Sequence, residues 1–180
     1  MPTWVALLRA VNLGRVNKVS MPVLREALTE AGFTNVRTYV QSGNIVLDSP
    51  MRSAAKVGTA VGRVVQERFG VDTPVVTRTG RQLAAVLEWN PFPEAVQERA
   101  KMVHVVHLTG TPDADKVKAL LAADVGRASV AHRGQEVVVD WVDVSGGSAA
   151  DKALKKLGVD GTARNWRTLT ALVDLTREQS

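Results

Sequence analysis

The chain has 180 residues, no cysteine, and the hydrophobic (45%) and charged (23%) fractions of an ordinary globular protein. The absence of cysteine excludes disulfides, thiolate nucleophiles and metal centres with cysteine ligands. The net charge of +5 comes from residues 1–56 and 151–180, which is too little for a dedicated DNA-binding arm but enough for a local anion site.

The first predicted element is a strand over residues 3–9. Its apolar run, residues 4–8, ends at Arg9 and is too short for a signal peptide or a membrane span. We therefore expect a cytoplasmic protein with no membrane partner.

Hydrophobic periodicity and turn residues then predict the rest of the first 79 residues. Pro74 falls in the fourth predicted strand and favours an edge position, because proline has no backbone N–H to donate to a neighbouring strand. After the first strand, the predicted elements are a helix between Ser20 and Gly32, strands over 36–40 and 45–47, a helix over 57–69 and a strand over 71–77.

This β-α-β-β-α-β order is that of the split β-α-β, or ferredoxin-like, plait. The first two strands are expected to be parallel, with the third strand between them. Thr79 and Gln82 form a capping box that opens the next helix, and residues 90–93 break it.

The pattern then restarts, but no final strand is visible in the second copy, and a last helix stands in its place. We predict an α+β fold of two tandem ferredoxin-like plaits, over 1–79 and 98–180, joined by a helix and proline-rich linker over 80–97. A single domain with one mixed sheet is the alternative. The elements of the second copy are strand 102–108, a helix opening at Thr111, a hairpin over 128–142, a helix over 149–157 and a helix over 164–176.

Familiar catalytic and metal-binding patterns are missing. His104 and His107 lie three apart in a predicted strand, so they point to opposite faces and cannot bind one metal ion. No carboxylate is paired with a base, and Ser42 has no histidine nearby in the sequence. We therefore predict no metal site and no cofactor, and no catalytic residue is assigned.

A basic loop between the first strand and the first helix is the first candidate site. It carries Arg9, Asn12, Arg15, Asn17 and Lys18, with no acidic residue among them. The loop leads into a helix N-terminus, where backbone N–H groups and the helix dipole favour an anion. The alternative is an ordinary solvated connection.

The turn between the second and third strands is expected to meet this loop. The first two strands are parallel, so both segments leave the sheet at the same edge. Amide, hydroxyl and guanidinium groups together make a donor-rich lining for an oxyanion. Alternatively, the amides only satisfy backbone groups of the turn. The turn contributes Tyr39, Gln41, Ser42 and Asn44.

The start of the predicted last helix is the third candidate. With Thr162 as its cap, Arg164, Asn165 and Arg167 fall in or near the first turn, where cations oppose the helix dipole. An acidic neighbour in the fold or a bound anion would offset this cost. Trp166 shares the helical spacing of Leu169 and is predicted to be buried.

Several strings of residues resemble the bacterial domain-of-unknown-function family 1697. Two positions depart from the family pattern: Arg15 replaces a common second glycine, and Ala10 replaces a frequent glycine, which makes this loop stiffer and more basic. The resemblance implies two plait-like subdomains and no established activity, so the site residues above rest on their own chemistry. It is carried by residues 6–14 (ALLRAVNLG), 18–25 (KVSMPVLR), 38–44 (TYVQSGN) and 162–166 (TARNW).

We expect a soluble binding protein for a small anionic ligand that bears phosphate or carboxylate. One alternative is an enzyme whose acid–base pair is not visible in the sequence. Another is a protein- or RNA-interaction module, although RNA is disfavoured because aromatic residues make up only 4% of the chain and the RNP pattern is absent. The oligomeric state is left open.

Overall fold

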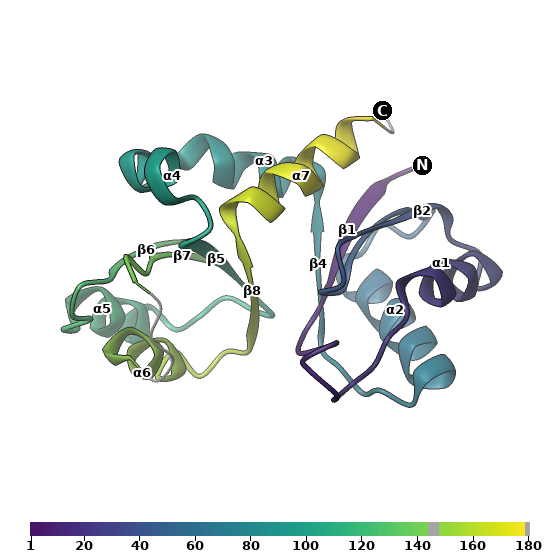
Figure 1. Ribbon diagram of the computed structural model, residues 1–180, viewed down its shortest axis with the longest axis horizontal. Helices are drawn as coiled ribbons and strands as arrows, with labels where there is room; N and C mark the ends of the chain where they lie inside the picture. Colours follow the sequence, from purple (N-terminus) through teal and green to yellow (C-terminus); the bar gives the residue numbers. More distant parts are fainter. Residues whose placement is uncertain (144–147, 179–180) are drawn as a thin grey trace. The chain divides into compact units, whose positions relative to one another are not determined.

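A computed structural model describes residues 1–143 and 148–178 and contains, within them, two four-stranded antiparallel sheets and seven helices (Figure 1). The chain forms two compact units. The first unit comprises Met1–Ala85 together with the end of the chain from Thr170, and the second comprises Val86–Leu169. None of the helices in the described ranges has the length and apolarity needed to span a bilayer.

The first sheet has the strand order β2-β3-β1-β4, and each neighbouring pair is antiparallel. β1 and β2 are therefore parallel to each other on either side of β3, as predicted. β4 is an edge strand, also as predicted, but Pro74 directly precedes it instead of lying within it. The elements are β1 (Thr3–Leu8), α1 (Met21–Glu30), β2 (Thr34–Tyr39), β3 (Asn44–Asp48), α2 (Ala54–Phe69) and β4 (Val75–Thr79).

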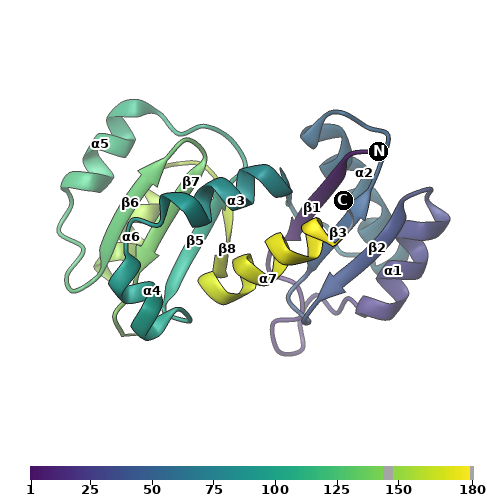
Figure 2. The ribbon, with the colours of Figure 1, turned by 90° about the horizontal axis from the view of Figure 1, so that it is seen from above.

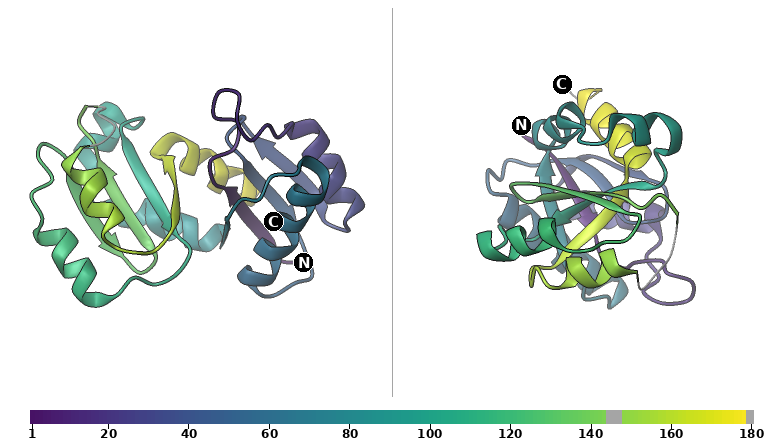
Figure 3. Two further views of the ribbon diagram at one scale, coloured as in Figure 1. Left: turned by 90° about the horizontal axis from the view of Figure 1, so that it is seen from below. Right: turned by 90° about the vertical axis from the view of Figure 1, so that its left-hand side faces the viewer.

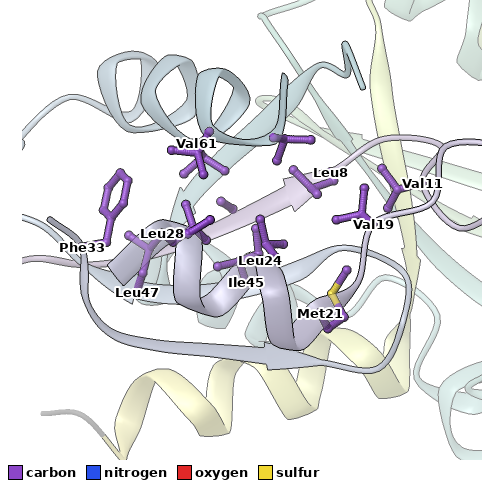
Figure 4. Close-up of a cluster of buried hydrophobic side chains, with 14 of the residues drawn as sticks. Leu8, Val11, Val19, Met21, Leu24, Leu28, Phe33, Ile45, Leu47 and Val61 are labelled. Atoms are coloured by element: carbon purple, nitrogen blue, oxygen red, sulfur yellow. The ribbon is translucent and has the colours of Figure 1, made fainter. Parts of the chain in front are cut away.

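The core of the first unit lies between one face of this sheet and the helices α1 and α2. Alternate residues of a strand point to the same face. Leu8 of β1 and Leu47 of β3 therefore share a face, and α1 covers it with Leu24 and Leu28 (Figure 4). Gly70 ends α2 in the left-handed conformation at φ 65°, as expected for a glycine in this position.

The second sheet repeats this arrangement with the order β6-β7-β5-β8, again antiparallel throughout (Figure 2). Its core lies under α5 and α6, where Leu120 and Leu157 pack against Leu108 of β5 and Val137 of β7. The elements are α4 (Pro93–Arg99), β5 (Val103–Leu108), α5 (Ala114–Ala122), β6 (Ser129–Arg133), β7 (Glu136–Asp140), α6 (Ala149–Lys155) and β8 (Gly161–Asn165).

β8 shows that the prediction of a missing final strand in the second copy was wrong. Its two buried side chains, Thr162 and Arg164, are polar, so the segment lacks the apolar alternation by which strands are recognised. The helix α7 (Trp166–Arg177) follows it directly. Asn165, rather than Thr162, caps α7, because its Oδ1 accepts a hydrogen bond from the Thr168 N–H at 2.9 Å.

A helix also follows the last strand of the first unit without a break. In α3 (Gly80–Trp89), the predicted capping box is present. The Thr79 N–H donates to Gln82 Oε1 at 2.8 Å, and the Gln82 N–H donates to Thr79 Oγ1 at 3.2 Å. The chain passes from the first unit to the second within α3, and returns to the first within α7.

Candidate functional site

The loop between β1 and α1 folds back on itself instead of running straight to the helix. Figure 3 (left) shows it, in dark purple, projecting from the end of β1. The Asn12 N–H donates to the Asn17 carbonyl at 2.9 Å, and Leu13 pairs with Val16 in an isolated antiparallel bridge. Asn12 and Asn17 both have positive φ, which asparagine tolerates better than most residues. The loop is therefore held in a turn by its own hydrogen bonds.

Asn12 joins this loop to the turn between β2 and β3. Its Nδ2 donates to the Val19 carbonyl at 2.8 Å and to the Gln41 carbonyl at 2.7 Å, while its Oδ1 accepts from the Val19 N–H at 2.8 Å. The loop and the turn lie at the same sheet edge, as the parallel orientation of β1 and β2 requires. One side chain thus fixes two segments that are 29 residues apart.

The turn itself, residues 40–43, is tightly packed. A Cβ at Gly43 would lie 2.7 Å from Leu8 Cβ and 2.8 Å from Val11 Cγ2, and its φ is +75°, so only glycine fits. Val40 also has a positive φ, 52°, which is unusual for a β-branched residue. Strain of this kind persists only where the surroundings hold it in place.

The asparagine amides of the predicted site serve the backbone. Asn17 Nδ2 donates to the Ala10 carbonyl, and the buried Asn44 donates from Nδ2 to the Tyr39 carbonyl and to Ser42 Oγ, each at 3.0 Å. For these amides, and for Asn12, the structural alternative stated above holds. Their hydrogen bonds hold the backbone of the loop and the turn, and these amides do not line the candidate site.

The groups exposed at this edge are cationic and polar. Arg15, Lys18, Gln41 and Ser42 are exposed, and among the described residues no carboxylate forms an ion pair with Arg15 or Lys18. Tyr39 and Arg9 are half-buried. Apolar side chains stand beside the cations, with exposed fractions of 63% for Leu13, 63% for Val16 and 54% for Val40.

Arg9, at the start of the loop, is anchored through its backbone. Its N–H donates to Thr73 Oγ1 at 3.1 Å, and Thr73 Oγ1 donates to the Arg9 carbonyl at 2.6 Å. The Arg9 N–H also lies 3.2 Å from the Pro74 carbonyl. The start of the loop is therefore held by the segment that leads into β4.

The third candidate group lies in the second unit and differs from the prediction. Arg164 is a strand residue whose Nη1 donates to Thr162 Oγ1 at 2.7 Å and to the Ala163 carbonyl at 2.8 Å. Burial lowers the pKa of Arg164 to about 10, which leaves it cationic at neutral pH. Of the predicted residues, only the exposed Arg167 lies in the first turn of α7.

Sequence patterns did not reveal the buried pair of His107 and Glu136. His107 Nδ1 lies 2.5 Å from Glu136 Oε2, and His107 is fully buried. The two residues are 29 positions apart, and only the register of β5 with β7 places them opposite each other. A polar residue in each of two apolar strands was the available signal. Within residues 1–143 and 148–178, no group of three or more histidine or acidic side chains could hold a metal ion.

A second basic surface of the first unit was also not anticipated. A cavity of about 540 Å³ lies beside the start of α3, lined by Thr3, Arg81, Thr176 and Arg177 among others. It adjoins the beginning of β1, whereas the basic loop adjoins its end. Arg81 and Arg177 are the charged side chains of its lining.

The comparisons with known proteins agree with this fold. The model of a family described as "Protein of unknown function (DUF1697)" matches residues 1–137. A solved structure, that of the conserved bacterial protein SP0830 from Streptococcus pneumoniae, is similar with a TM-score of 0.74, covering 97% of this chain and 98% of that chain at 21% identity. No curated protein matches. At this identity the structural likeness shows a shared fold only.

Proposed function

This chain belongs to the DUF1697 family, and we propose that it is a binding protein for a small anionic ligand, bearing phosphate or carboxylate, at the loop edge of the first unit. The observation that carries the proposal is the pair of hydrogen bonds from Asn12 Nδ2 to the Val19 and Gln41 carbonyls. They fix the basic loop against the polar turn, so that the exposed Arg15 and Lys18 belong to one built edge.

Preorganisation supports a binding role for this edge. A flexible loop would lose conformational freedom when it closed on a ligand, and that loss weakens binding. Here Asn12, Asn17 and Val40 already hold left-handed backbone conformations in the free protein. Strained backbone of this kind clusters at ligand clamps.

The exposed side chains suit an oxyanion. The planar guanidinium of Arg15 matches two oxygens of a carboxylate or phosphate, and Lys18 adds a point charge. Ser42 and Gln41 bring a hydroxyl and an amide from the turn. Because these cations are exposed, each contributes only about 1 kcal/mol of attraction at 4 Å, and salt weakens binding.

We propose further that both units are ferredoxin-like plaits. The support is that the β-α-β-β-α-β element order recurs in each unit with equivalent strand orders, β2-β3-β1-β4 and β6-β7-β5-β8.

A thermal-shift titration tests the binding role. The full chain is titrated at low ionic strength with phosphate, sulfate and small carboxylates, and saturation near 100 times Kd is expected to raise stability by about 2.7 kcal/mol. The variant Arg15→Gln/Lys18→Gln is expected to fold and to lose this rise. The matched control Arg52→Gln/Lys56→Gln removes the same charge from exposed residues at the other end of the first sheet and is expected to keep it.

Two results would contradict the proposal. Wild-type protein that shows no rise with any anion of the panel does not bind such a ligand. A rise that survives in Arg15→Gln/Lys18→Gln but disappears in Arg81→Gln locates the anion in the cavity beside α3 instead of the loop edge.

A further inference from the structure

Exposed apolar side chains gather at the loop edge of the first unit. Six large hydrophobic side chains are exposed in the described ranges, and half of them, Leu13, Val16 and Val40, belong to the basic loop and the neighbouring turn. Single exposed apolar residues are common on protein surfaces, whereas several that gather at one place mark a binding surface. The loop edge therefore has an apolar part as well as its cations.

Hydrogen bonds hold these apolar side chains beside a cation. The Val16 N–H donates to the Leu13 carbonyl at 3.1 Å, and the two residues pair in the antiparallel bridge of the loop. Residues paired in this way present their side chains on the same face, and Arg15 lies in the turn between them. Asn12, which precedes Leu13, donates to the carbonyl of the residue after Val40 at 2.7 Å. The apolar residues of the loop and of the turn are therefore neighbours.

Val40 is not explained by packing or by backbone preference. Its side chain is 54% exposed, so it contributes little to the core. Its φ is 52°, a left-handed conformation that glycine or asparagine adopts more readily than a β-branched residue does. A strained, exposed valine indicates that its apolar side chain serves a contact outside the fold.

We infer that the ligand of the loop edge is a phosphate monoester with a short apolar group. The inference rests on the proposed function and names the class of its ligand. The free oxygens of a monoester suffice for both cations, because the guanidinium of Arg15 binds two of them and Lys18 binds the third. The apolar group packs on the side chains of Leu13, Val16 and Val40.

The apolar contact supplies what the cations lack. Exposed cations bind weakly, because solvent and salt screen them. Removing apolar surface from water adds affinity in proportion to the area that is covered. An amphiphilic anion is therefore expected to bind here more tightly than inorganic phosphate.

The edge suits a soluble ester better than a bilayer. Attachment to anionic lipids takes a cluster of about four to eight basic residues. Arg15 and Lys18 are the exposed cations of the basic loop and the turn, and Gln41 and Ser42, also exposed, are uncharged. A small soluble ester is therefore the expected ligand, rather than the headgroup of a lipid in a bilayer.

Methyl phosphate and n-butyl phosphate are the probes, because they carry the same charge and differ only in the length of the alkyl chain. Each is titrated into the full chain at low ionic strength, and NMR gives the two dissociation constants. We expect n-butyl phosphate to bind at least about fivefold more tightly, since its chain covers apolar surface. It should also shift the methyl signals of Leu13, Val16 and Val40, while those of the exposed Leu121 in the second unit stay in place.

Two variants test the apolar part of the site and keep its cations. Leu13→Gln/Val16→Thr replaces exposed side chains by polar ones of similar size, so it is expected to fold, to bind methyl phosphate as the wild type does and to lose the preference for n-butyl phosphate. Val40→Asn relieves the backbone strain, so it is expected to melt at or above the wild-type temperature and to show a weaker preference. The matched control Leu121→Gln removes a leucine of similar exposure and is expected to keep the preference.

The possible failures are distinguishable. Equal affinities of the wild type for the two esters would overturn this inference and leave the proposed function intact, because both esters would still bind. The absence of saturable binding of either ester would overturn both. A preference that survives in Leu13→Gln/Val16→Thr would contradict the inference. So would saturable binding to vesicles that contain phosphatidic acid without any preference for n-butyl phosphate, because it would assign the edge to a bilayer.

Discussion

At the scale of single residues, Asn12 holds the loop and the turn of the loop edge together, although it is only half-buried. Its amide makes three hydrogen bonds to two separate segments, and its φ is 55°. Asn12→Ala loses all three bonds and strains the backbone, so we expect a loss of about 2–3 kcal/mol in urea unfolding. Asn12→Gly keeps the left-handed conformation and should separate the two effects. A loss below 0.5 kcal/mol for Asn12→Ala, roughly the scatter of surface substitutions, would show that the bridge is unimportant.

Trp166 is a buried residue that the sequence identified correctly. Its exposed fraction is 6%, and Leu169, one turn on, is fully buried. Trp166→Ala leaves a large cavity and is expected to cost about 3–5 kcal/mol. Calorimetry or urea unfolding measures this cost, and a wild-type melting temperature for the variant would mean that the side chain does not pack as described.

His104 makes stability depend on pH. Burial lowers the pKa of His104 below 6.5, outweighing the hydrogen bond from its Nε2 to the Lys101 carbonyl at 3.1 Å. The unfolded chain therefore takes up this proton at a higher pH than the folded chain does. The His104 contribution is fully present above pH 6.5 and is lost as the pH falls toward the lowered folded-state value. We expect the stability difference between wild type and His104→Gln to shift in the variant's favour below pH 6.5. A difference that stays constant between pH 5 and 8 would contradict this.

At the scale of elements, a helix cap could be predicted from the sequence where it follows a local pattern. Thr79 and Gln82 stand three residues apart and form the capping box as predicted. Asn165 could not be recognised as a cap, because the strand before it was not recognised. Thr79→Ala and Asn165→Ala are each expected to destabilise the protein by about 1 kcal/mol in urea unfolding. An unchanged free energy of unfolding in either variant would show that its cap is dispensable.

β8 could not be predicted from hydrophobic periodicity. Apolar runs identified β1, β5 and β7, because most of their buried residues are apolar. In β8 the buried positions are Thr162 and Arg164, and no local pattern reveals that these polar residues are covered in the fold. The pair of His107 and Glu136 was not predicted for a related reason, since the contact between them depends on strand register, which is a property of the sheet and not of either strand.

At the scale of the whole molecule, two units of the same topology carry different polar residues. The parallel orientation of β1 and β2 was predictable from element order, and it correctly brought the loop and turn of the first unit together. The sequence did not predict which polar side chains line the edge. The amides of Asn12, Asn17 and Asn44 form hydrogen bonds with the backbone instead.

Single-stranded RNA is expected to bind weakly. Sheet-based recognition stacks bases on exposed aromatic rings. Trp4 and Trp166 are 5% and 6% exposed, so neither offers a ring face to a base. The half-buried aromatic residues Tyr39 and Trp141 belong to different units, so they do not form one stacking surface on a single sheet. We expect poly(U) to leave the tryptophan fluorescence unchanged at physiological salt. Saturable quenching under these conditions would instead favour an RNA-binding module.

Backbone amide NMR during a phosphate titration tests the loop-edge site most directly, because it reports where an anion sits without any substitution. The account predicts saturable shifts in residues 9–18 and in the turn over 40–44, including the Asn12 side-chain amide that joins them. The signals around Arg81 and Arg177, in the cavity beside α3, should stay in place. Shifts confined to that cavity, or no saturable shift anywhere, would contradict the account.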